Sequence, residues 1–297
     1  MKSKAVTEKV MRGVFFIAAC ASVLAVALIC IFLFANGIPA IRQIGVVKFL
    51  TGDIWRPGNE LFGIFPMILG SIYVTAGAIV FGVPIGILTS VFMAMYCPKK
   101  IYKPLKSATE LLAGIPSVVY GFFGMVVIVP IIRDFGKWMK AMNLVERSGD
   151  GKGILTTSIV LGMMILPTII GTTESAMRSV PTQYYEGALA LGATHERSIF
   201  TVVIPAAKSG VIAGIVLGIG RAIGETMAVI MICGNQPRLA QNILMGVRTL
   251  TGNIVIEMGY ATGLHREALI ATGVVLFVFI LIINFSVALI KRRGEHE

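Results

Sequence analysis

Charged residues are scarce in this sequence, and their scarcity excludes most soluble folds. Only 14% of the 297 residues are charged, whereas 56% are hydrophobic, and the mean hydropathy is +0.86. Soluble domains have about 25% charged residues. The composition therefore predicts an all-α membrane protein that crosses the lipid several times.

Patterns typical of metal, nucleotide and catalytic sites are also missing. The four cysteines have no paired spacing, the three histidines are isolated, and no GxxxxGK[ST] loop occurs. We expect no metal, no cofactor and no catalytic residue in this chain. One histidine, His195, is expected simply to lie on the protein surface.

The net charge of +11 is explained by membrane topology. Basic residues lie beside apolar segments and form no stripe with interleaved aromatic residues, so we expect no nucleic-acid partner. Six segments are long enough to cross a hydrocarbon core, which takes about 20 helical residues. They lie near residues 14–35, 67–96, 111–132, 154–176, 209–233 and 268–290. Basic residues in 99–106 and 291–293 place both termini in the cytoplasm by the positive-inside rule.

These spans predict three regions and a location in the cell membrane. Residues 1–66 hold the first span and an external loop, residues 67–290 form the transmembrane core, and residues 291–297 are a cytoplasmic tail. In the first region, the turn-forming residues 55–59 predict a surface loop.

The cytoplasmic segment 177–208 is long, since loops between packed helices usually have about 2 to 8 residues. Pro181 suits the first turn of a helix, and Gly192 is placed to end that helix in a left-handed conformation. Thr194 then caps a second short helix, which Pro205 ends. The pattern predicts two short helices joined by a tight turn, which we call the helical hairpin.

The spacing of five residues in this hairpin resembles the EAA loop of type I ABC importer permeases. These residues are Glu186, Gly187, Ala188, Gly192 and Pro205. Gly187 stands where the family usually has alanine, and Ile204 where it usually has leucine. The resemblance implies the MetI-like permease fold with six transmembrane helices, and a loop that docks into a cleft of a cytoplasmic ATPase. The alternative is a hairpin that lies at the membrane surface without such a partner.

The fifth expected span carries a stripe of glycines and two opposite charges. Gly210, Gly214 and Gly218 recur at every fourth position, which lets another helix approach closely. We expect that helix to belong to a sister subunit. Arg221 and Glu225 lie seven residues beyond Gly214 and Gly218, so in an unbroken helix both charges share the glycine face and pair at i, i+4.

Arg221 is expected near the middle of the membrane, where a charged residue is costly and usually functional. Its planar guanidinium matches a tetrahedral oxyanion, and Glu225 would orient it, so both residues are candidates for a substrate path. The alternative is a structural ion pair that only fixes helix packing. Ser117 is a third candidate, because it follows Pro116 at a helix start or kink. There the alternative is a serine that only hydrogen-bonds the carbonyl freed by the proline.

Three further segments resemble the PstC family, the permease subunits of bacterial phosphate importers. They are residues 115–121, 174–181 and 220–228. The resemblance implies import of inorganic phosphate by a heterodimer with a PstA-like sister permease, two PstB-like ATPase subunits and an external PstS-like phosphate-binding protein. Permeases for sulfate or molybdate share related Arg-Ala-x-Gly-Glu segments, so another oxyanion is an alternative.

An ion-coupled secondary transporter is a further alternative, for which Glu225 is the only deep carboxylate. Glu174 and Arg178, at the end of the fourth span, lie four residues apart on one helix face. We expect them to form a simple ion pair at the membrane surface.

Overall fold

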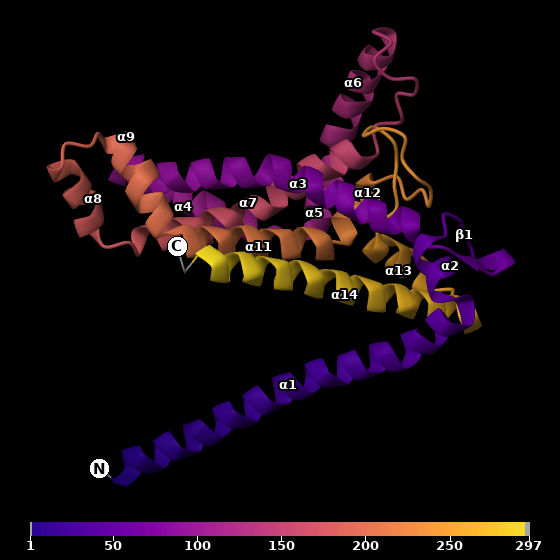
Figure 1. The fold of residues 1–297 in the computed structure, drawn as a ribbon, viewed down its shortest axis with the longest axis horizontal. Helices are drawn as coiled ribbons and strands as arrows, with labels where there is room; N and C mark the ends of the chain where they lie inside the picture. The colour runs from indigo at the N-terminus through magenta and orange to yellow at the C-terminus, as the bar shows by residue number, and fades with distance from the viewer. Residues whose placement is uncertain (1, 295–297) are drawn as a thin grey trace.

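The computed structural model describes residues 2–294 of the chain, which form an elongated bundle of helices (Figure 1). Five helical segments are long and apolar enough to cross a membrane. They are Val10–Ile44, Phe65–Tyr96, Ser117–Ala141, Ile154–Arg178 and Gly263–Ser286. A sixth results if His195–Ala206 and Lys208–Gly224, which are bent by 71° relative to each other, count as one broken span. These segments follow the order of the six predicted spans, and the all-α membrane fold is confirmed.

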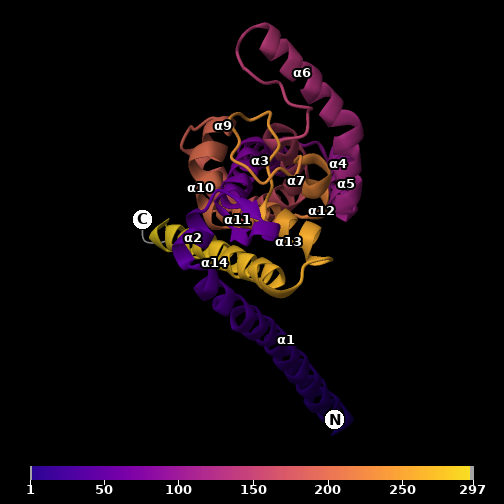
Figure 2. The ribbon, with the colours of Figure 1, turned by 90° about the vertical axis from the view of Figure 1, so that its right-hand side faces the viewer.

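The first span extends well beyond the predicted residues 14–35, because α1 comprises Lys2–Ile44. Its second half packs along α14 (Gly263–Gly294). The rings of Phe34 and Phe277 meet edge to face there, with their centroids 5.7 Å apart. The first half of α1 stands apart from the other described helices, as Figures 1 and 2 both show.

The segment after α1 folds into a compact unit, in which residues 57–59 form the predicted surface turn, whereas Trp55 is buried and not part of a surface loop. It contains α2 (Val46–Thr51), β1 (Trp55–Arg56), the 3₁₀ turn η1 (Pro57–Asn59) and β2 (Leu61–Phe62). Trp55 pairs with Phe62 across the hairpin of β1 and β2 and is only 4% exposed. Its indole Nε1 donates a hydrogen bond to Glu257 Oε2 at 2.8 Å. A buried indole N–H needs such an acceptor, and this one lies 202 residues further along the chain.

Glu257, on α13 (Leu250–Met258), ties this unit to the rest of the molecule. Besides Trp55, its carboxylate contacts His265 Nε2 at 2.8 Å and accepts a hydrogen bond from Arg248 Nη1 at 2.5 Å. His265 lies in the first turns of α14. One buried carboxylate therefore joins β1, α13 and α14.

The centre of the bundle is the contact between the second and fourth spans. α3 (Phe65–Val91), continued by the π-helical turn η2 (Phe92–Tyr96), packs along α7 (Ile154–Arg178). A methyl group on Gly82 would lie 2.7 Å from the Ile165 side chain, and one on Gly86 would lie 2.7 Å from Ile169. Both isoleucines are fully buried. The glycines of the second span therefore let α7 approach closely enough to form the core.

The remaining helices position the candidate site. Before and within the third span lie α4 (Lys99–Gly114), α5 (Ser117–Phe123), η3 (Gly124–Ile128) and α6 (Val129–Ala141). The helical hairpin and the segment that connects it to α11 contain four elements. They are α8 (Thr182–Ala190), α9 (His195–Ser198), the π-helical turn η4 (Ile199–Val203) and α10 (Ile204–Ala206). The residues of the predicted fifth span, 209–233, form α11 (Lys208–Gly224) and α12 (Met227–Ile232).

The start of α1 and the end of α14 lie towards the same end of the molecule as α8 and α9, on the left in Figure 1. β1 and α2 lie towards the other end. The assignment of the first end to the cytoplasm stays a prediction, as does the division of the chain into residues 1–66, 67–290 and 291–297.

Candidate functional site

The fifth span is broken, which the sequence did not predict. α11 ends at Gly224, and Glu225 has an extended backbone (φ −69°, ψ 133°). α12 begins at Met227. The side chain of Glu225 accepts a hydrogen bond from the Ala228 N–H, with 3.2 Å between Oε1 and N. An acidic side chain that caps a new helix in this way favours a break over a continuous helix.

Arg221 and Glu225 consequently do not form the predicted ion pair. The ion pairs within 4.0 Å among the described residues include neither of them. Arg221 Nη1 donates to Thr168 Oγ1 on α7 at 3.5 Å, whereas the main-chain oxygen of Glu225 accepts a hydrogen bond from Thr251 Oγ1 at 3.1 Å. In the described structure, the Arg221 guanidinium therefore carries its charge on a membrane-spanning helix without a carboxylate partner.

The third span starts later than predicted, because the chain is not helical at Ile115 and Pro116. Both residues are extended (ψ 126° and 142°) and separate α4 from α5. Ser117 is the first residue of α5 and is half-buried. The hydrogen bond from Ser117 to the freed carbonyl, which was the alternative to a role in the substrate path, is not formed. Tyr120 instead donates its hydroxyl to the Leu112 carbonyl across the break at 2.9 Å.

α5 carries Ser117 to the helix that follows the break in the fifth span. A methyl group on Gly121 of α5 would lie 2.9 Å from the Cα atom of Ala228, so α5 and α12 are in close contact. Ala228 is also the residue whose N–H is capped by Glu225. The hydrogen bonds of the described residues do not link Ser117 with Arg221 or Glu225, so the three candidates lie in neighbouring helices and not in one bonded cluster.

The glycine stripe of α11 faces α7 of the same chain. A methyl group on Gly214 would lie 3.1 Å from Thr173 Oγ1. One on Gly218 would lie 3.0 Å from Ile169 Cγ1, and Gly210 also lies against α7. The structure therefore replaces the expected contact with a sister subunit by a contact within the chain, because these three glycines remove the side chains that would keep α11 and α7 apart.

The helical hairpin has the predicted form. α8 carries Glu186, Gly187 and Ala188, and α10 contains Pro205. Gly192 has a left-handed backbone (φ +85°), as its place at the end of α8 predicted. Thr194 Oγ1 accepts a hydrogen bond from the Arg197 N–H at 3.3 Å and so caps α9. In Figure 1, α8 and α9 project from one end of the bundle.

His195 does more than lie on the surface, so that prediction is wrong. Its Nδ1 atom is 2.5 Å from the Tyr185 hydroxyl on α8. Its ring also packs edge-on against Tyr96, with the centroids 4.8 Å apart. Tyr96 is the last residue of η2. This contact attaches the hairpin to the end of the second span, in addition to its covalent connection to the fifth span.

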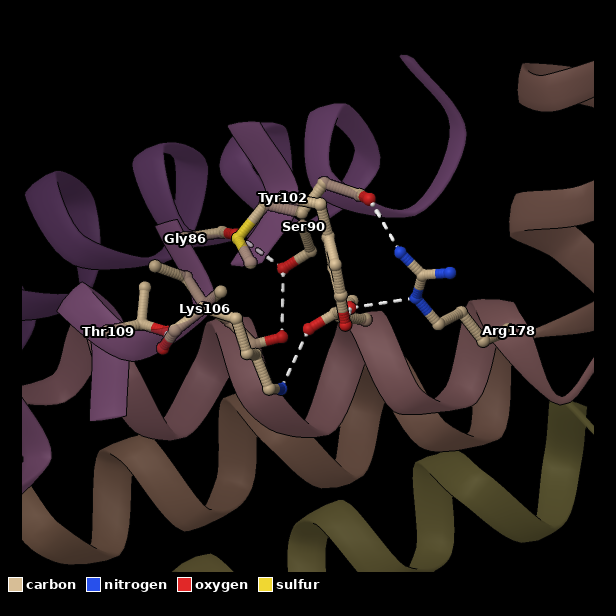
Figure 3. A network of polar contacts seen from close by, with 9 residues as sticks. Gly86, Ser90, Tyr102, Lys106, Thr109 and Arg178 are labelled. Carbon is tan, nitrogen blue, oxygen red and sulfur yellow. Dashed lines mark hydrogen bonds and ion pairs between the residues drawn. The ribbon is translucent and has the colours of Figure 1, made fainter. Parts of the chain in front are cut away.

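A cluster around Glu174 was missed by the sequence analysis. Glu174 is 1% exposed, and its carboxylate accepts hydrogen bonds from Tyr102 Oη (2.6 Å), Lys106 Nζ (2.9 Å) and Arg178 Nε (2.8 Å). Figure 3 shows Tyr102 and Lys106 of α4 and Arg178 of α7 converging on one place. Arg178 Nη2 also donates to the Met93 carbonyl of η2 at 2.9 Å. We call Glu174, Tyr102, Lys106 and Arg178 the Glu174 cluster.

The cluster was predicted only as a simple pair of Glu174 and Arg178. Their spacing is visible in the sequence, but Tyr102 and Lys106 lie 72 and 68 residues away from Glu174, and no local pattern connects them. The hydrogen bond to Glu174 raises the pKa of the Lys106 ammonium and also the pKa of the Tyr102 phenol above their ordinary values. Both groups therefore keep their protons throughout the neutral range.

Comparison with known proteins identifies the family of the chain. Residues 82–295 match the family model described as "Binding-protein-dependent transport system inner membrane component". The chain belongs to this family. The probable ABC transporter permease protein YqgH of Bacillus subtilis is 38% identical over 286 residues, which cover 92% of this chain and 89% of that protein. The phosphate transport system permease protein PstC of Mesorhizobium japonicum is 36% identical over 265 residues, 86% of this chain and 81% of that protein.

The fold of this transport component also resembles solved structures. A chain of the MetNI methionine ABC transporter, solved in inward-facing conformations, has a TM-score of 0.57 and 20% identity, and the match covers 81% of this chain and 99% of that chain. The MetI-like permease fold is thus confirmed. As an inner membrane component with several apolar helices, the chain is a multi-pass membrane protein.

The side chains of this transport component limit the kind of ligand that it could bind. Its residues 2–294 contain no group of three or more His, Cys, Asp or Glu side chains able to hold a metal ion, and the four cysteines are unpaired. The geometry instead provides an arginine without a carboxylate partner beside a helix break. Such a site attracts an anion.

Proposed function

We propose that this chain is the permease subunit of an ATP-driven importer and forms the path for inorganic phosphate. The observation that carries the proposal is the half-buried Arg221 guanidinium, which has no carboxylate within 4.0 Å in the described part of the chain. One charged residue at the centre of a membrane helix costs about 2.5 to 3.5 kcal/mol on insertion scales. A passing oxyanion offsets this cost, because the planar guanidinium donates two parallel hydrogen bonds to it.

Glu225 and Ser117 border the same path in this proposal. Glu225 follows the end of α11, and its carboxylate caps α12 instead of neutralising Arg221. The positive potential of Arg221 therefore remains available to an anion. Ser117 begins α5, which packs on α12, so its hydroxyl lies on the adjacent helix.

Phosphate is favoured over other oxyanions by the relatives of the chain, since one named as a phosphate transport permease is 36% identical to it. Sulfate and molybdate are also tetrahedral, and a guanidinium alone does not separate them from phosphate. The helix break argues against an ion-coupled secondary transporter. Glu225, the expected site for a coupling ion, already serves as a helix cap.

The helical hairpin is the proposed docking site for the cytoplasmic ATPase. Leu191, beside the turn at Gly192, is 91% exposed, so an apolar side chain is available to anchor in a cleft of the partner. The residues that form this docking site are Glu186, Gly187, Ala188, Gly192 and Pro205. ATP and Mg²⁺ bind to the ATPase in this proposal, and the permease has no catalytic residue or cofactor of its own.

The proposed assembly is a heterodimer with a PstA-like sister permease, carried by two PstB-like ATPase subunits. An external PstS-like protein delivers phosphate. The family description supports the external partner, because it names transport that depends on a binding protein. The ATPase is supported by the relative named as an ABC transporter permease.

Uptake of labelled phosphate by the complete importer in lipid vesicles tests this function. Arg221→Gln should lower uptake about 10- to 100-fold, because each hydrogen bond to a charged group contributes about 1.5 to 3 kcal/mol. Arg221→Lys keeps the charge without the planar fork and should keep part of the activity. The control is Arg133→Gln on α6, whose side chain is 48% exposed and whose removal should leave uptake unchanged.

Two results would overturn the proposal. One is an assembled Arg221→Gln importer that takes up phosphate at the unmodified rate. The other is uptake driven by an ion gradient in the absence of ATP. Stronger competition by sulfate or molybdate than by unlabelled phosphate would keep the importer but change its substrate.

A further inference from the structure

The Glu174 carboxylate lies where three structural elements meet. Oε1 accepts hydrogen bonds from Tyr102 and Arg178, and Oε2 accepts one from Lys106. The guanidinium of Arg178 also lies over the Tyr102 ring, 4.3 Å from its centroid. Two cations thus surround one buried anion. Hydrogen bonds to ionised groups are the strong ones, so this arrangement ties α4 and α7 together.

α4 depends on this cluster for its position. The helix has no buried residue along its length, and it contributes no side chain to the buried core. It packs against α7, and its Tyr102 and Lys106 side chains bind the carboxylate of Glu174 there. Because little apolar area of α4 is buried, polar contacts contribute most to its attachment: Tyr102 and Lys106 bind Glu174 in the middle of the helix, and Tyr120 binds the Leu112 carbonyl near its end.

The cluster also reaches the helical hairpin. Arg178 donates to the Met93 carbonyl of η2, and Tyr96 at the end of the same turn packs on His195 of α9. π-helical turns inside a helix are frequent at functional sites. A continuous series of contacts therefore leads from the hairpin through η2 to Arg178 and Glu174.

α4 leads from this cluster to the candidate substrate path. It ends at Gly114, passes through the extended residues Ile115 and Pro116, and continues as α5 from Ser117. α5 packs on α12, directly after the break at Glu225. The position of α4 therefore affects the position of Ser117.

We propose that Glu174 is a positioning residue for transport. Its carboxylate holds α4 on α7 and orients Arg178, which binds η2, so that movement of the helical hairpin by the ATPase reaches the break between α4 and α5. This inference rests on the proposed function, but the attachment of α4 by Glu174 can be measured without transport.

The test uses the complete importer, in which the four cysteines of this chain and any accessible cysteine of its partners are replaced, with a spin label on Lys103→Cys. Lys103 is an exposed residue of α4 outside the Glu174 cluster. Glu174→Gln should increase the mobility of the label, because the neutral amide binds Lys106 and Arg178 less strongly. In vesicles it should lower the phosphate imported per ATP hydrolysed about tenfold. Glu174→Asp keeps the charge and should restore part of both properties.

The matched control is Glu110→Gln, which removes an exposed carboxylate from the same helix. It should change neither the mobility of the label nor the ratio of phosphate to ATP. An assembled Glu174→Gln importer with unchanged label mobility, or with more mobile α4 but an unchanged ratio, would overturn the proposal.

A second variant covers the case in which Glu174→Gln fails to assemble. Tyr102→Phe removes one hydrogen-bond donor to Glu174 and keeps both cations. It should increase the mobility of the label and lower the phosphate imported per ATP, each by less than Glu174→Gln does. If it shows neither, the proposal is wrong. If the unmodified importer moves no phosphate at all, the proposed function fails, whereas the label still reports whether Glu174 holds α4.

Discussion

Arg221 and Glu225 lie on opposite sides of a helix end, and their side chains bind different partners. α11 stops at Gly224, so Arg221 reaches Thr168 on α7 at 3.5 Å while Glu225 caps α12 through the Ala228 N–H at 3.2 Å. In a continuous helix, an acidic residue at this spacing would neutralise the arginine. The helix end separates the two roles: Arg221 supplies positive charge, and Glu225 shapes the backbone.

The first prediction follows from this separation. In a double-mutant cycle of Arg221→Gln and Glu225→Gln, the changes in the free energy of unfolding should add within about 0.5 kcal/mol. Denaturant titration of the purified chain measures them. The cycle of Lys106→Met and Glu174→Gln is the positive control, because these side chains are in direct contact at 2.9 Å. A coupling between Arg221 and Glu225 as large as in that control would contradict the separation.

The second prediction concerns the turn of the helical hairpin. Gly192 has φ +85°, which a β-branched residue adopts only under strain. Gly192→Val should therefore uncouple ATP hydrolysis from phosphate uptake in the assembled importer, as measured by the ratio of the two rates in vesicles. Gly187→Ala is the control, because Gly187 is in α8 with open space around it and the change should be tolerated. Normal coupling in Gly192→Val would show that the turn does not transmit the ATPase movement.

The third prediction concerns the glycine stripe. Gly214→Leu should lower the free energy of unfolding of the chain by about 1 to 3 kcal/mol, because the new side chain overpacks the contact between α11 and α7. Gly220→Leu, at a position with no atom within 4 Å of an added Cβ, should cost much less. Both are measured on the chain expressed without its partners. A loss of stability that appears only in the assembled importer would place the stripe against another subunit.

The fourth prediction concerns the buried carboxylate of Glu257. Trp55→Phe removes the N–H that donates to Glu257 Oε2 and should lower the free energy of unfolding by about 1 to 3 kcal/mol. Leu61→Ala in the paired strand changes a side chain that is 44% exposed and should cost less than about 0.5 kcal/mol. Equal effects of the two changes on thermal unfolding would show that the hydrogen bond from Trp55 does not hold the hairpin of β1 and β2.

Several features of the candidate site were predictable because their causes are local. A glycine at the end of a short helix followed by a capping threonine predicts a turn, and Gly192 and Thr194 form it. Arg221 was recognised because a charge inside an apolar stretch is visible without any partner. Other features were not predictable in this way. Glu225 was expected to bind Arg221, one turn earlier, but α11 ends at Gly224 and the Glu225 carboxylate accepts a hydrogen bond from the Ala228 N–H instead.

The sequence by itself determined the order of the spans and the helical hairpin, because apolar length and helix caps depend on residues that are close together along the chain. Only the tertiary structure decided which helix the glycine stripe meets and which donors surround Glu174 and Glu257. Trp55 and Tyr102 bind carboxylates 202 and 72 residues away. A buried acid must take its donors from the helices packed around it, so these partners were set by packing between spans and could not be deduced from any one segment.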